Sequence, residues 1–124
     1  MIVHLDTSIL IEALATADPN LLRPPSVRGD ILVVSTLVLY EWRRRPRSAD
    51  QLGVLEALFP LERIVTFGPD EACLAGKIYQ SVKRARTREV DIAIAACAVE
   101  HEASLWTLNP KDFKDIPGLT LYHG

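Results

Sequence analysis

The sequence predicts a single α/β domain over residues 1–124, built on a small parallel sheet with helices on both faces. Short apolar runs of strand length alternate along the chain with longer segments of helical periodicity. The second run, Ile31-Leu32-Val33-Val34, is apolar throughout, which is typical of a strand that is buried on both faces. The chain of 124 residues, 48% of them hydrophobic, is long enough for one core and too short for two sizeable domains.

Five short apolar runs have the length and composition of buried strands. They are residues 2–5, 31–34, 63–67, 105–107 and 119–122. The first ends at Asp6 and the second at Ser35, both of which are residues that favour a turn or a helix start. Because helical segments separate the runs, the strands are expected to pair in parallel through crossover connections.

The predicted helices begin at capping residues and carry apolar side chains at helical spacing. In chain order, the start signals are Thr7 or Ser8, Ser35 or Thr36, the capping box Ser48-Ala49-Asp50-Gln51, Pro69 with Asp70, and Asp91. The second helix is expected to end at Pro46 and the third near Leu58. Residues 18–30 are rich in proline, which favours a connection with a short helical turn.

Composition excludes several classes of protein. The 14 Lys and Arg against 16 Asp and Glu give a net charge of −2, so nucleic-acid binding would need a local basic patch. The longest apolar run, Ile92 to Val99, is far short of the roughly 20 residues that span a bilayer. Cys73 and Cys97 lack metal-ligand spacing and are expected to be buried free thiols. We therefore expect a soluble cytoplasmic protein with no membrane partner.

Four acidic residues lie at the edge of the predicted parallel sheet where functional side chains are expected. Asp6 ends the first strand, Glu41 lies one to two helical turns after the second, Asp91 starts an alanine-rich helix, and Asp112 follows the fourth strand. Ligands of such sheets bind beyond the carboxyl ends of the strands. Gathered carboxylates repel one another unless a cation neutralises them, and Mg²⁺ prefers oxygen ligands of this kind. Such a site suits phosphodiester hydrolysis, in which the metal activates a water.

Each of these acids also has an ordinary structural interpretation. Asp6 fits a helix N-cap, and Asp91 fits a first-turn acid that is favoured by the helix dipole. Glu41 can pair with a following arginine, and Asp112 can lie in an exposed turn. Taken singly, carboxylates are more often structural than catalytic, so their positions alone leave the function open.

Four segments of the chain form an ordered set of motifs: Leu5-Asp6-Thr7-Ser8-Ile9-Leu10, Ser35-Thr36-Leu37-Val38-Leu39-Tyr40-Glu41, Asp91-Ile92-Ala93-Ile94-Ala95-Ala96 and Thr107-Leu108-Asn109-Pro110-Lys111-Asp112-Phe113. In these motifs and their order the chain resembles PIN-domain proteins, and more narrowly the VapC-type ribonuclease toxins of bacterial and archaeal toxin–antitoxin pairs. The resemblance runs from residue 2 to about residue 122. It implies a metal-dependent endoribonuclease with a five-stranded parallel sheet, a cognate antitoxin and a homodimer.

Carried over by position, the resemblance also implies a set of site residues. Asp6 and Asp91 would be the primary ligands of Mg²⁺ or Mn²⁺, and Glu41 would hold the metal directly or through water. Thr7 or Thr107 would orient a water or a carboxylate.

The fourth acid of the family differs in position among its members. Some members of the family place this acid where the chain has Asn109. We assign the role to Asp112, with Asn109 as a supporting polar group.

Two clusters of basic residues flank the proposed acids. The first holds Arg43, Arg44, Arg45 and Arg47, and the second holds Lys83, Arg84, Arg86 and Arg88. We predict that Arg43, Arg44, Arg84, Arg86 and Arg88 bind RNA through its phosphates, which would make the affinity salt-dependent. The alternatives are solvated helix ends, where arginines complement the dipole, and a docking site for an acidic antitoxin segment.

Two rival functions are weighed against the nuclease. A non-catalytic PIN-like module that binds RNA or protein would not need Asp6, Glu41 and Asp91. An aspartate-based phosphatase of the haloacid dehalogenase type needs a second Asp two residues after the first, where this chain has Ser8.

The sequence also gives a physical reason to expect a homodimer. The helix from Ser48 to Leu58 carries a set of large apolar residues, namely Leu52, Leu55, Leu58 and the following Phe59, with Trp42 close by. Such a surface suits a two-fold contact of roughly 800 Å² per partner. The alternative is that these side chains complete the core of the monomer.

Overall fold

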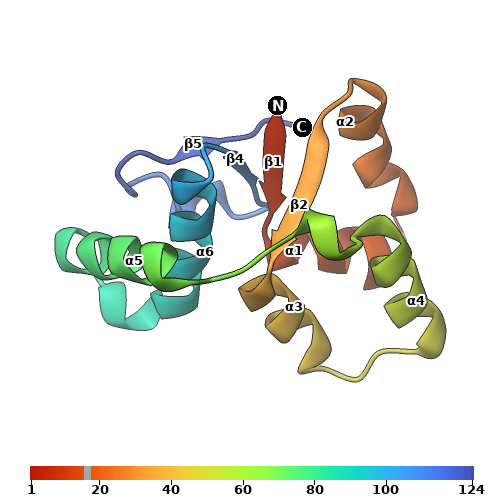
Figure 1. The fold of residues 1–124 in the computed structure, drawn as a ribbon, viewed down its shortest axis with the longest axis horizontal. Coiled ribbons are helices and arrows are strands. Elements are labelled where there is room, and N and C mark those ends of the chain that lie inside the picture. The colour runs from red at the N-terminus through yellow and green to blue at the C-terminus, as the bar shows by residue number, and fades with distance from the viewer. Residues whose placement is uncertain (16–17) are drawn as a thin grey trace.

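Five parallel strands form the sheet in the computed structural model, which describes residues 1–15 and 18–124 (Figure 1). The strands are β1 (Ile2–Leu5), β2 (Ile31–Ser35), β3 (Ile64–Val65), β4 (Ser104–Trp106) and β5 (Thr120–Leu121). Their order is β3-β2-β1-β4-β5, and each neighbouring pair is parallel. The predicted parallel sheet is confirmed, although β3 and β5 are shorter than expected.

The order of the strands reverses at β1. From β1 the chain builds outward through β2 and β3, and it then returns to place β4 and β5 on the other side. His4 of β1 accordingly lies opposite both Val33 of β2 and Leu105 of β4. The carboxyl ends of β1 and β4 therefore meet at a topological switch point, where open α/β sheets bind their ligands.

Helices cover both faces of this sheet (Figure 1). They are α1 (Thr7–Leu10), α2 (Arg23–Val27), α3 (Thr36–Arg43), α4 (Ala49–Leu58), α5 (Pro69–Ser81) and α6 (Glu89–Glu100). Helices α5 and α6 pack together on one side, and α1, α2 and α4 lie on the other. Helix α3 lies below the carboxyl edge, where it contacts both α1 and α6. In the described part of the chain, no helix is long and apolar enough to cross a membrane.

Local capping signals account for where α3 and α4 begin. The Ser35 hydroxyl accepts a hydrogen bond from the Val38 amide at 3.2 Å, and the predicted capping box of Ser48 and Gln51 is present. The first helix departs from expectation, because its N-cap is Asp6 rather than Thr7 or Ser8.

Residues 18–30 are more helical than predicted. They contain a 3₁₀ turn (Pro19–Leu22) and α2, which has prolines in its first turn. Proline is tolerated there because the first turn of a helix does not use its amide hydrogens.

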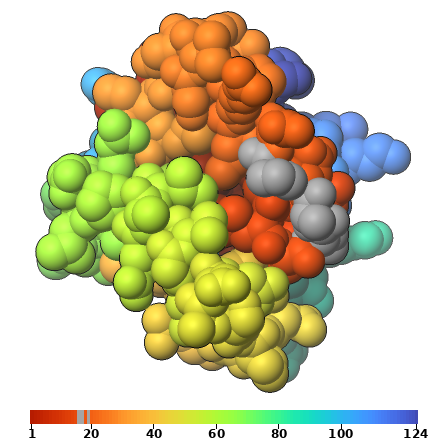
Figure 2. Space-filling model, turned by 90° about the vertical axis from the view of Figure 1, so that its right-hand side faces the viewer, coloured from red at the N-terminus to blue at the C-terminus, as the bar shows by residue number. Residues whose placement is uncertain are grey.

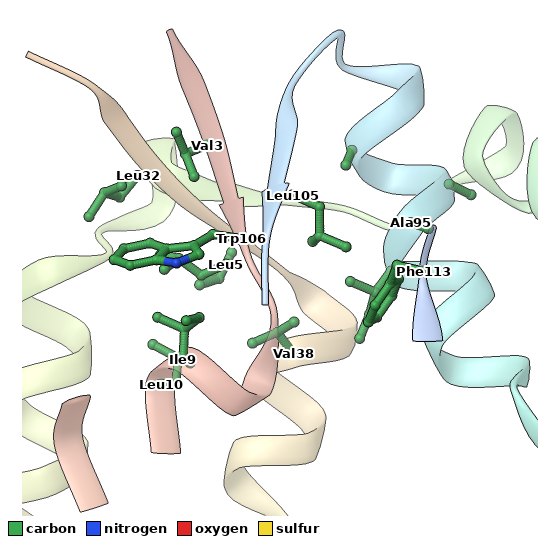
Figure 3. Close-up of a cluster of buried hydrophobic side chains, with 14 of the residues drawn as sticks. Val3, Leu5, Ile9, Leu10, Leu32, Val38, Ala95, Leu105, Trp106 and Phe113 are labelled. Carbon is green, nitrogen blue, oxygen red and sulfur yellow. The ribbon is translucent and has the colours of Figure 1, made fainter. Parts of the chain in front are cut away.

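The core lies against both faces of the sheet (Figure 3). On the side of α1 it contains Val3, Leu5, Ile9, Leu10, Leu32 and Trp106, and on the side of α6 it contains Ala95, Leu105 and Phe113. Alternation along β1 places Val3 and Leu5 on the first face and His4, which is only 1% exposed, on the second. The alanines of α6 are small enough to let that helix lie close to the sheet, which fixes the position of its N-terminus.

Helix α4 divides its apolar residues between core and surface. Figure 2 shows the face on which α4, α2 and residues 11–15 meet solvent. Leu55 and Phe59 are buried, whereas Leu58 is 44% exposed. Trp42, which was predicted to flank a dimer surface, is completely buried in the monomer.

The two cysteines differ in exposure. Cys73 is exposed, contrary to expectation, because its face of α5 is turned to solvent, whereas Cys97 is buried in α6.

Candidate active site

Asp6 stands at the switch point, directly after β1. Its backbone amide donates to the Trp106 carbonyl at 2.9 Å, which extends the pairing of β1 with β4 by one residue. The side chain is 5% exposed. The hydroxyls of Ser8 and Thr107 both donate to Oδ2 of Asp6, each at 2.8 Å. These bonds fix the orientation of the carboxylate, and neither of them uses its Oδ1.

Ser8 is a site residue to which the sequence analysis gave no role. Its hydroxyl also accepts a hydrogen bond from the Leu108 amide at 3.0 Å, so it joins the start of α1 to the segment after β4. The sequence does contain a signal for this role, because a hydroxyl residue two positions after an acid at a strand end can form a local side-chain hydrogen bond to that acid.

Glu41 approaches the same place from α3. Thr7 donates from Oγ1 to Glu41 Oε1 at 2.5 Å, and Arg44 Nη2 lies 3.6 Å from Oε2. The two threonines that were predicted to orient a water or a carboxylate therefore each bind a different acid. Thr7 holds Glu41, and Thr107 holds Asp6.

Asp91 lies in the first turn of α6, opposite these two acids. Its pKa is raised to about 6, first by burial and then by the charges of Asp6, Glu41 and Asp112, while the charge of Arg88 acts in the opposite direction. Since charge repulsion of this kind acts only over short distances, the acids predicted from scattered parts of the sequence come close together in the fold.

A cleft of about 210 Å³ lies between the three acids. It is lined by Asp6, Thr7, Ser8, Ile11, Glu41, Arg44, Arg45, Asp91 and Asn109. A second hollow of about 310 Å³ is lined by Glu41, Asp91 and residues 86–90. Because Glu41 and Asp91 line both hollows, the two form a continuous groove with acids at its centre and arginines along its length.

The PIN-domain family model matches residues 3–119 of the chain. The chain belongs to the PIN-domain family. No curated protein sequence is significantly similar to it. The resemblance found in the sequence motifs is thereby confirmed at the level of the family.

Solved structures extend the comparison. VapBC-1 from nontypeable Haemophilus influenzae matches with a TM-score of 0.76 and 25% identity, over 98% of this chain and 97% of the matched chain. A toxin–antitoxin complex from Klebsiella pneumoniae matches with a TM-score of 0.74 and 25% identity, over 98% and 99%. VapBC2 from Rickettsia felis, bound to a promoter DNA fragment, has the same fold at 21% identity, a TM-score of 0.76 and 98% coverage of both chains. The predicted resemblance to VapC-type proteins agrees with these matches.

The segment after β4 supplies Asn109 to the cleft of this PIN domain. Asn109 lines the cleft, and its amide donates to Thr107 Oγ1 at 3.0 Å. Asp112 lies one 3₁₀ turn further on, exposed, at the end of Pro110–Asp112. Asp112 acts on Asp91 through its charge but does not line the cleft. Of the two candidates for the fourth position, Asn109 therefore lines the cleft, whereas Asp112 acts on Asp91 from outside it.

The donor set of the cleft fits a hard, hydrated cation. Among the described residues, no three His, Cys, Asp or Glu side chains converge closely enough to ligate one ion together. Mg²⁺ typically takes only one or two protein carboxylates and keeps several of its waters. Asp6 and Asp91 offer such carboxylates, and the charge repulsion felt at Asp91 is what a cation would relieve.

The predicted RNA-binding arginines occupy different places in the PIN domain. Arg44 lines the cleft together with Arg45, and Arg86 lines the adjoining hollow. Arg43 and Arg84 are exposed and line neither.

Arg88, the fifth predicted RNA contact, lines the second hollow but uses its guanidinium for contacts within the protein. Arg45, which was not among the five, lines the cleft itself.

Proposed function

We propose that the chain is a metal-dependent endoribonuclease that acts as the toxin of a toxin–antitoxin pair. One observation carries the proposal. Asp6, Glu41 and Asp91, from three different elements, line one cleft at the switch point of a PIN-domain sheet. The likeness to VapBC and toxin–antitoxin structures supports the toxin assignment.

The residues of the cleft divide the work of the reaction. Asp6 and Asp91 would hold Mg²⁺ or Mn²⁺, with Glu41 acting directly or through a water. When bound, the metal activates a water for attack on the phosphodiester and screens the charge of the transition state. Ser8 and Thr107 hold the Asp6 carboxylate in its orientation, and Thr7 does the same for Glu41.

The groove supplies the contacts for the nucleic acid. Arg44, Arg45 and Arg86 would bind phosphates on either side of the scissile bond, which gives an affinity that falls with salt. The exposed Arg43 and Arg84 would extend the same contacts beyond the groove. The preference for RNA rests on the family resemblance.

The family resemblance also implies binding partners and a cellular location for the chain. We assign the chain a cognate antitoxin as inhibitor, a second copy of itself as dimer partner, and a cytoplasmic location. In this arrangement the antitoxin would neutralise the nuclease until the toxin is released.

Cleavage assays with Asp91→Asn test the activity. Wild-type protein should cut total cellular RNA or transfer RNA in the presence of Mg²⁺ or Mn²⁺ and lose this activity in EDTA. Asp91→Asn should lower the rate by 100-fold or more, on the order expected when a metal ligand is lost. The matched control is Asp70→Asn, which changes an exposed first-turn acid of α5 and should keep the wild-type rate. Cleavage by Asp91→Asn at the wild-type rate would refute the assignment of the site.

A further inference from the structure

Arg88 joins two segments of the chain that are distant in sequence, the start of α6 and the segment after β4. Its Nη1 donates to the Lys83 carbonyl and to Asp115 Oδ2, both at 2.9 Å. Its Nη2 donates to the Asp112 carbonyl at 2.7 Å and to Asp115 Oδ1 at 2.6 Å. The Arg88 side chain is 16% exposed. The paired contact with both oxygens of Asp115 is the forked geometry in which an arginine–carboxylate pair is strongest.

These contacts leave Arg88 little to offer to a nucleic acid. A guanidinium has five N–H donors, of which four lie on Nη1 and Nη2. The four hydrogen bonds of Arg88 account for those four. A phosphate could take their place only if the contacts within the protein broke. Arg86, two residues earlier, is by contrast exposed in the same hollow.

The segments that Arg88 joins each lead to the cleft. Arg88 is the N-cap residue of α6, and its carbonyl accepts the Ile92 amide at 2.9 Å, so it is part of the turn that presents Asp91. Asp112 and Asp115 lie in the segment that begins at Asn109, whose amide is bound to Thr107. Thr107 in turn orients Asp6. The Arg88–Asp115 contact therefore closes a path from one proposed metal ligand to the other.

We propose that Arg88 is a positioning residue, which with Asp115 fixes the segment 109–115 against the N-terminus of α6 and so sets the spacing of Asp6, Asn109 and Asp91. Its catalytic consequence rests on the proposed function, whereas the structural tie does not. Asp115 lines neither hollow and acts through Arg88.

Kinetics of Arg88→Ala, Asp115→Ala and the double variant test the proposal, with Arg86→Ala for comparison. Arg88→Ala and Asp115→Ala should each lower kcat, by on the order of 10- to 100-fold for a displaced catalytic group. The double variant should lose no more than Arg88→Ala alone, because the two residues act as one unit. Their KM and RNA affinity should stay within about twofold of wild type. Arg86→Ala should do the reverse, weakening RNA binding with little change in kcat.

The salt dependence of RNA binding in EDTA separates positioning from phosphate contact. A lost phosphate contact reduces the slope of log K against log salt by about 0.7 on a single strand. Arg86→Ala should show this reduction and Arg88→Ala should not. An equal reduction in Arg88→Ala, or losses of kcat that multiply in the double variant, would overturn the proposal. Asp115→Asn, which keeps the side-chain volume, provides a test if Arg88→Ala fails to fold.

Amide hydrogen exchange gives a readout that needs no nuclease activity. The amides of Asp112, Phe113 and Ile116 are hydrogen-bonded within the tied segment. Arg88→Ala and Asp115→Ala should speed their exchange by about 10-fold or more and leave the middle of α5 unchanged. If the wild type proves inactive on RNA while this exchange responds, the proposed function fails and the tie stands. Unchanged exchange in both variants would refute the tie, even in an active enzyme.

Discussion

The Asp91 carboxyl group is held where its charge is unfavourable. Burial, together with the neighbouring acids, raises its pKa from 3.8 to about 6. An acid with a higher pKa in the folded chain than in the unfolded chain stabilises the fold when it is protonated. This contribution is lost as the pH rises from about 4 to about 6. At neutral pH, the ionised Asp91 therefore destabilises the protein when no cation is bound.

Asp91→Asn should accordingly stabilise the metal-free protein at pH 7. We expect the free energy of unfolding to rise by about 1–2 kcal/mol, after allowance for solvent screening at a half-buried site. Urea unfolding in EDTA should show the gain at pH 7 and little of it at pH 4. Mg²⁺ or Mn²⁺ should raise the Tm of the wild type and leave that of Asp91→Asn unchanged. Equal stability of the two proteins at both pH values would show that Asp91 is not strained by its neighbours.

At the same scale, the sequence predicted the acids of the site better than the groups that hold them. Asp6 was found because it ends a strand, and Asp91 because it stands at the start of a helix. Both positions are recognisable from the local sequence pattern. The bond from Thr107 to Asp6 spans 101 residues, and the tie from Arg88 to Asp115 spans 27. Such pairings depend on how the elements pack, so the sequence pattern assigned Arg88 to RNA by its charge alone.

At the scale of elements, helix starts were more predictable than strand lengths. The caps of α3 and α4 are made within four residues, so Ser35 and Ser48 are recognisable locally. The extent of a strand depends instead on its partner. Strand β3 pairs with only the last two residues of β2, which limits it to Ile64–Val65.

Ser48→Ala measures the contribution of one such local signal. The variant removes the hydroxyl that accepts the Gln51 amide at 3.1 Å, so the free energy of unfolding should fall by about 1 kcal/mol. Nuclease activity should not change, because α4 does not contribute to the cleft lining. Ser81→Ala is the control, since that hydroxyl bonds only the Ile78 carbonyl near the end of α5 and should cost less. A loss of activity in folded Ser48→Ala would show that α4 is coupled to the site.

At the scale of the whole molecule, burial decides which surface is left for a second copy. Trp42 is fully enclosed, and Leu55 and Phe59 complete the core, so these three are not available. Leu58 remains 44% exposed and Leu61 85% exposed. Leu58 also lines a hollow of about 280 Å³ together with residues of α2 and β2. The proposed dimer must therefore use a smaller apolar set than the sequence indicated.

Sedimentation at micromolar concentration tests this surface. We expect the wild type to sediment at twice the monomer mass of 13.8 kDa. Replacing Leu58 and Leu61 with Lys should shift it to the monomer, because a buried, unpaired charge is strongly unfavourable at an apolar contact. Tyr79→Lys, which changes an exposed residue of α5, should remain dimeric. A wild-type mass of 13.8 kDa with no dependence on concentration would exclude the dimer, and the groove of one copy would then have to bind the whole RNA segment.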